Sequence, residues 1–89
     1  MDRDELWAAI ECDLRCACQM LPDDAADDEA IGLYREFIEH NELGLACEML
    51  ESYADRNSVP NEFWITLRDA AIKMNLPETV ARFGRRIST

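Results

Sequence analysis

Glycine and proline are scarce in this chain of 89 residues, which contains three of each. That is too few for a fibrous chain or a long disordered segment. No uninterrupted apolar run approaches the roughly 18 residues needed to cross a bilayer. The first five residues, Met1 to Glu5, form neither a basic nor an apolar segment. No signal peptide is therefore expected, and the expected compartment is the cytoplasm.

Residues that commonly carry catalysis are also few. His40 is the only histidine, and its place at a helix junction is more typical of a capping or surface group than of a base. No serine or cysteine lies in a recognisable nucleophile motif, and there is no glycine-rich phosphate loop. The many carboxylates could act as a catalytic pair only in a cleft that shifts their pKa. The sequence predicts a protein that is not an enzyme and uses no cofactor.

The four cysteines lack the spacing of a metal site. Zinc sites generally use Cys-x2-Cys pairs, whereas Cys12 and Cys16 are four residues apart, Cys18 follows and Cys47 is distant. The acidic run at residues 23–29 lacks the ligand alternation and central glycine of a calcium loop. Without a secretion signal, reduced thiols are expected. We interpret the cysteines as small buried apolar side chains; the alternative, a thiol-based metal protein, would be purified with stoichiometric zinc.

Basic residues are few and unevenly placed. Nine Lys and Arg oppose nineteen Asp and Glu, which gives a formal net charge of −10. Residues 1–55 carry sixteen acidic side chains and three arginines, whereas residues 56–89 carry three acidic and six basic ones. Phosphate backbones and anionic membranes should repel such a chain, so neither nucleic acid nor a membrane is expected as a partner. A basic protein partner is favoured, unless the charge only provides solubility.

Helical periodicity is present throughout, because apolar residues recur every three or four positions and no strand-like alternation competes. The short connections predict antiparallel neighbours. We therefore expect an all-α fold, a compact antiparallel bundle of four main helices plus a short C-terminal helix, in a single domain of residues 1–89. The expected helices are Glu5 to Leu21, the acidic turn 22–29 to about Glu39, Glu42 to about Arg56, a fourth stopped by residues 75–77, and a fifth holding Val80, Phe83 and Ile87.

The helices should share one core and use local caps. Asn41 is the expected N-cap of the third helix and Ser58 that of the fourth, and the acidic turn suits the start of the second. The expected core consists of Trp7, Ile10, Leu14, Ile31, Tyr34, Ile38, Ala46, Leu50, Tyr53, Trp64, Leu67 and Ala71.

The first helix carries a second, smaller apolar strip, formed by Ala8, Ala9, Cys12, Cys16 and Met20. In one arrangement the C-terminal segment from Val80 to Ile87 folds back over this strip. In the other, the helix meets its own copy in a two-fold homodimer. The fold-back is favoured, because Arg82, Arg85 and Arg86 would then lie beside the acidic first helix. A monomer is accordingly favoured over a homodimer.

The segment from Tyr34 to Leu50 reads YREFIEHNELGLACEML. It contains an aromatic–aliphatic pair, a His-Asn turn, and a Glu followed by Leu-Ala-x-Glu-x-Leu. The stretch from Phe63 to Leu76 is a similar helix that ends in Met-x-Leu. Residues 31–76 thereby resemble small bacterial immunity proteins of the MafI type. The resemblance implies an all-α protein that binds and neutralises a toxin from a polymorphic or contact-dependent system, with no catalytic residues.

Toxins of these systems are frequently nucleases, whose clefts are positive because they bind phosphate. A small acidic bundle can fill such a cleft, and opposite charges speed association. We expect an immunity protein that neutralises its cognate toxin by stoichiometric binding; the alternative is a small acidic adaptor or regulatory subunit that binds a basic protein. Unpaired like charges on one helix face repel each other until a basic partner relieves them. The expected contact residues are Asp23, Asp24, Asp27, Asp28, Glu48, Glu51 and Asp55.

Overall fold

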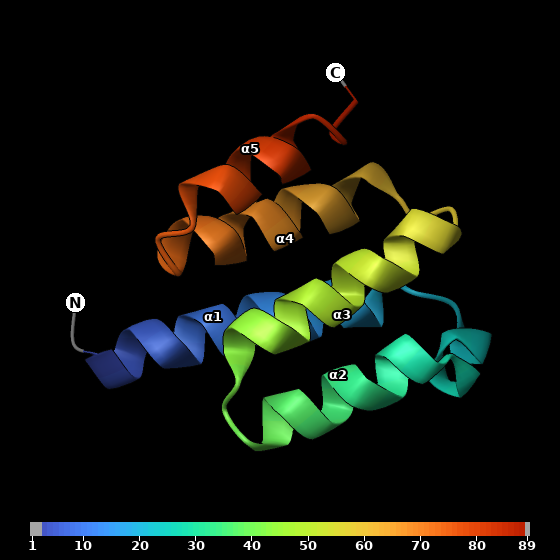
Figure 1. The fold of residues 1–89 in the computed structure, drawn as a ribbon, viewed down its shortest axis with the longest axis horizontal. Coiled ribbons are helices and arrows are strands. Elements are labelled where there is room, and N and C mark those ends of the chain that lie inside the picture. Colours follow the sequence, from blue (N-terminus) through green and yellow to red (C-terminus); the bar gives the residue numbers. More distant parts are fainter. Residues whose placement is uncertain (1–2, 89) are drawn as a thin grey trace.

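The computed structural model describes residues 3–88, and Met1, Asp2 and Thr89 lie outside the described residues. Within residues 3–88 all regular structure is helical (Figure 1), so the predicted all-α class is confirmed. None of these helices is long and apolar enough to cross a lipid bilayer. The elements are α1 (Arg3–Gln19), the 3₁₀ helix η1 (Asp23–Asp27), α2 (Glu29–Glu39), α3 (Leu43–Arg56), α4 (Asn61–Lys73) and α5 (Pro77–Gly84).

The predicted helix boundaries hold to within about two residues, with two differences. α1 ends at Gln19 rather than Leu21, because the residue before Pro22 avoids the helical backbone region. The acidic turn that follows is itself a short helix, η1, which buries only Ala25. η1 therefore presents its aspartates at a corner between α1 and α2.

The α-helices pack mainly in three pairs, of which α2 with α3 and α4 with α5 are consecutive in the chain and α1 with α4 is not. In Figure 1 successive α-helices run in opposite directions. α2 packs mainly on α3, whereas α1 packs mainly on α4, which also supports α5. α1 and α2 are thus joined by η1 without being each other's main partners. This arrangement leaves space between them.

The predicted core is confirmed with one exception. All the expected residues are buried except Trp7, which is 38% exposed. Trp7 lies near the start of α1, and the guanidinium of Arg3 lies 5.7 Å from the centre of its ring. Periodicity gives the side of the helix on which a residue lies. Periodicity does not show how much of that side is covered by other helices, and the ring of Trp7 is only partly covered.

The predicted N-caps of α3 and α4 are wrong. Glu42 precedes α3 and Pro60 precedes α4, and neither side chain accepts a capping hydrogen bond. Asn41 has a φ of 57°, in the left-handed region that asparagine tolerates better than most residues. Ser58 lies two residues before Pro60 and is exposed.

Asn41 ends α2 instead of starting α3. Its backbone N–H donates to the carbonyl of Ile38 at 3.2 Å, and the N–H of Glu42 donates to Phe37 at 2.9 Å. This pair of bonds is a Schellman closure, which places a left-handed residue just after the helix. Asn75, also at a φ of 57°, ends α4 by the same pattern.

The expected fold-back of the C-terminal segment onto α1 is wrong. α5 packs on α4, where the buried ring of Phe83 lies 5.7 Å from the ring of Trp64. Arg82 and Arg86 pair with carboxylates of α3 rather than of α1. The hydrophobic anchor of α5 therefore decides its position, and Ala8, Cys12 and Cys16 of the strip on α1 stay exposed. The oligomeric state remains a prediction.

Candidate functional site

Asp28, one of the seven expected contact residues, is engaged inside the protein. Its Oδ1 accepts a hydrogen bond from the backbone N–H of Ala30 at 2.8 Å, which caps α2. Both carboxylate oxygens also accept hydrogen bonds from the Arg56 guanidinium, at 3.0 and 3.1 Å. The hydrogen bonds from Arg56 and Ala30 hold the pKa of Asp28 below its ordinary value. Asp28 thus fastens the start of α2 to the end of α3.

Replacing Asp28 by alanine is expected to lower the midpoint of thermal unfolding by several degrees at pH 7, because α2 loses its cap and Arg56 its partner. The pKa of Asp28 is lower in the folded protein than in the unfolded chain. The stabilisation that the ionised Asp28 provides is therefore fully present above a pH of 3.8, the ordinary pKa, and is lost as the pH falls through the lower folded-state pKa. Thermal unfolding followed by circular dichroism at pH 7 and pH 2 measures both effects. The control is Asp24→Ala, at an exposed aspartate. Equal midpoints for the two variants at pH 7 would contradict the role of Asp28.

Glu51 and Asp55, two more of the expected contact residues, pair with an arginine of α5 and with one that follows it. Arg82 donates two hydrogen bonds to Glu51, at 2.6 and 2.9 Å, and Arg86 donates one to Asp55 at 2.6 Å. These arginines relieve the repulsion along α3, so the inference that this face is unpaired is wrong for both carboxylates. Glu48, on the same face, is exposed and has no ion pair among residues 3–88.

Asp23, Asp24 and Asp27 remain, and we call these three aspartates the acidic corner. All are exposed on η1, at the bend where the chain passes from α1 to α2 (Figure 1). Within the described part of the chain, no lysine or arginine pairs with them. The acidic corner therefore places three exposed carboxylates close together on a short helix, where the basic surface of a partner protein can contact them.

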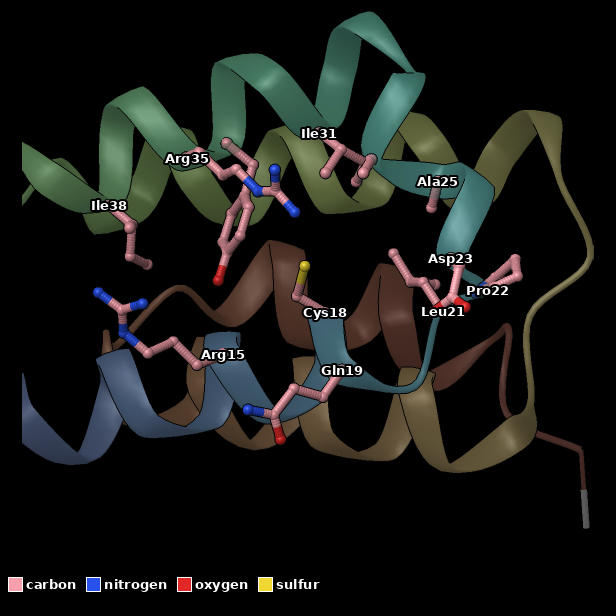
Figure 2. Close-up of a pocket in the computed structure, with 12 residues that line it drawn as sticks. Arg15, Cys18, Gln19, Leu21, Pro22, Asp23, Ala25, Ile31, Arg35 and Ile38 are labelled. Carbon is pink, nitrogen blue, oxygen red and sulfur yellow. The ribbon is translucent and has the colours of Figure 1, made fainter.

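A cleft of about 480 Å³ opens between α1 and α2, next to the acidic corner. Figure 2 shows Arg15 from α1 and Arg35 from α2 in the space between the two helices, with the Cys18 thiol pointing across it. Leu21, Ala25 and Ile31 lie toward the η1 end. The full lining is Arg15, Cys18, Gln19, Leu21, Pro22, Asp23, Ala25, Ala26, Ile31, Tyr34, Arg35 and Ile38.

The lining of the cleft contains two arginines and one aspartate, although the protein as a whole is acidic. Arg15 donates one hydrogen bond to Glu11 at 3.3 Å, and Arg35 has no ion pair within residues 3–88. Burial raises the pKa of Tyr34 well above its ordinary value, and burial likewise raises that of Cys18, against the influence of Arg35 and Arg15. Near neutral pH the cleft therefore presents two guanidinium groups, a phenol and a thiol, and the carboxylate of Asp23 lies at its η1 end.

The cysteines are placed differently from the expectation that all are buried. Only Cys47 is buried, Cys18 is intermediate, and Cys12 and Cys16 are exposed. Burial raises the pKa of Cys47 to about 12, so its thiol is protonated and shielded. The interpretation as buried apolar residues is wrong for Cys12 and Cys16, because α5 does not cover the strip on which they lie.

His40 lies at the C-terminus of α2, where its Nδ1 is 2.8 Å from the carbonyl oxygen of Glu36. It is exposed and follows the capping role expected from its position. Among residues 3–88, no three His, Cys, Asp or Glu side chains are grouped to hold a metal ion.

Neither a protein-family model, nor a curated protein, nor a solved structure matches this chain. The candidate surfaces are accordingly argued from geometry and charge. The acidic corner was expected from the sequence. The cleft was not expected from the sequence. The feature that could have indicated it is that Arg15 and Arg35 are two of only three basic residues among the first 55.

Proposed function

We propose that this chain is a non-catalytic immunity protein that binds a basic toxin domain of the nuclease type in the cytoplasm and neutralises it by forming a stoichiometric complex. The observation that carries the proposal is the acidic corner. Asp23, Asp24 and Asp27 are exposed and have no ion pair in residues 3–88, whereas Asp28, directly after them, is paired with Arg56.

The acidic corner suits a cationic partner for two physical reasons. Neighbouring like charges repel each other, and a cationic surface would remove that cost on binding. A net charge of −10 also attracts a basic protein over distance, which raises association rates by about 10- to 1,000-fold. Rapid association is useful to an immunity protein, because the toxin has to be bound before it acts on its own substrate.

The direct test is co-expression with the toxin gene that neighbours the gene for this chain. We expect growth to be rescued and the two proteins to be purified together. The matched control is Leu14→Asp, which buries a charge at a position with no solvent exposure and should fail to rescue. A toxin that kills cells regardless of this chain would contradict the proposal. A stable complex with a basic protein that is not toxic would support the alternative of an adaptor.

A further inference from the structure

The cleft between α1 and α2 has the composition of a ligand site rather than of a packing defect. Its volume of about 480 Å³ lies within the range of about 300–1,000 Å³ typical of small-molecule sites. α1 and α2 pack mainly on other helices, so each can present side chains to the space without losing its own support.

The polar half of the cleft is suited to a single anion. Arg15 and Arg35 approach from opposite helices (Figure 2), and guanidinium groups bind carboxylates through paired, charge-assisted hydrogen bonds. Tyr34 is only 3% exposed, yet it lines the cleft, and its protonated hydroxyl is a further donor. Arg15 is held by one long bond to an exposed glutamate, and Arg35 by no ion pair in residues 3–88.

The other half of the cleft is apolar and carries a negative charge at its η1 end. Leu21, Ala25 and Ile31 lie there, near η1 (Figure 2). Asp23 lines the same end, so a second anionic group on a ligand would be repelled. A ligand that fits both halves has one negative group and an uncharged apolar body.

We propose that the cleft between α1 and α2 binds a small amphiphilic anion, namely one carboxylate attached to a short apolar body. The carboxylate lies between Arg15 and Arg35, and the apolar body covers Leu21, Ala25 and Ile31. The net charge of −10 would otherwise repel any anion, so the two arginines provide the local attraction. This site goes beyond the toxin-binding role and does not depend on it.

Isothermal titration calorimetry with octanoate, below its micelle concentration, tests the site. We expect one saturable site, and at least about tenfold weaker binding to the double variant Arg15→Gln/Arg35→Gln. The double variant Arg3→Gln/Arg85→Gln, which removes two exposed arginines elsewhere, should bind as the parent protein does. Glu11→Gln breaks the same ion pair as Arg15→Gln but keeps the cation, and it should bind at least as tightly. The uncharged analogue 1-octanol should bind more weakly than octanoate.

Protection of Cys18 gives a second readout on the folded parent protein. Cys18 lines the cleft, whereas Cys12 and Cys16 lie exposed on the strip of α1. Octanoate should therefore slow alkylation of Cys18 by iodoacetamide, measured by peptide mass spectrometry, and leave Cys12 and Cys16 unchanged. No detectable octanoate binding, or equal binding by the Arg15→Gln/Arg35→Gln variant with unprotected Cys18, would overturn the proposal.

Discussion

Replacing Phe83 by alanine is expected to lower the free energy of unfolding by about 3–5 kcal/mol, the usual loss for a fully buried phenylalanine. Phe83 is completely buried and is the only buried residue of α5. Its ring lies 5.7 Å from Trp64 and 5.6 Å from the guanidinium of Arg82. Helices as short as the 8 residues of α5 are not stable alone in water. The burial of this ring therefore decides whether α5 forms.

Chemical denaturation followed by far-ultraviolet circular dichroism measures this loss. The control is Ile72→Ala on α4, where the side chain is 54% exposed and the expected change is within about 0.5 kcal/mol. A Phe83→Ala variant as stable as Ile72→Ala would show that α5 is not anchored by this ring. Arg82 of α5 and Arg86, two residues after α5, also pair with carboxylates of α3. Because the Phe83→Ala variant keeps both arginines, it tests the hydrophobic anchor separately from the ion pairs.

Reversing the charge of the acidic corner is expected to weaken toxin binding by at least about tenfold at low ionic strength, mainly through slower association. The variant is Asp23→Lys/Asp24→Lys/Asp27→Lys. These side chains are exposed and support no ion pair within the described chain, so the fold should be retained. The affinity of the variant should also vary less with salt, because fewer opposite charges are screened.

The matched control is Glu36→Lys/Glu39→Lys/Glu42→Lys, which changes the net charge by the same amount at the opposite end of α2. Surface plasmon resonance at two salt concentrations gives association and dissociation rates for both variants. If both weaken binding equally, the net charge matters and the acidic corner is not the contact. An unchanged affinity of the corner variant at low salt would remove it from the interface.

The sequence predicted the helices and almost all of the core because helical periodicity is a local property. Ile10, Leu14 and Leu67 recur on one face of their helices, and all three are buried. Trp7 follows the same periodicity but is partly exposed. Whether a residue near the start of a helix is covered depends on how far the neighbouring helices extend, which periodicity does not show. The N-cap predictions were wrong for a related reason. An asparagine between two helices can end the first or begin the second, and the sequence alone does not show that Asn41 ends α2 in a left-handed conformation.

The candidate site was harder to predict because ion pairs join residues far apart in the sequence. Asp28 pairs with Arg56, 28 positions later, and Glu51 with Arg82, 31 positions later. The count of charges showed an acidic excess in the first 55 residues but could not show which carboxylates were neutralised. The cleft could not be predicted either, because it depends on contacts between distant parts of the chain: α1 and α2 pack mainly on different helices.

The central claim is that this chain neutralises its toxin by stoichiometric binding, and titration of toxin activity tests it most directly. Purified chain is added in increasing amounts to a fixed concentration of toxin domain, well above the dissociation constant, and residual nuclease activity is measured. We expect activity to fall linearly to zero at one equivalent of the chain, which is then recovered chemically unchanged. Full nuclease activity in the presence of a large excess of folded chain would contradict the account.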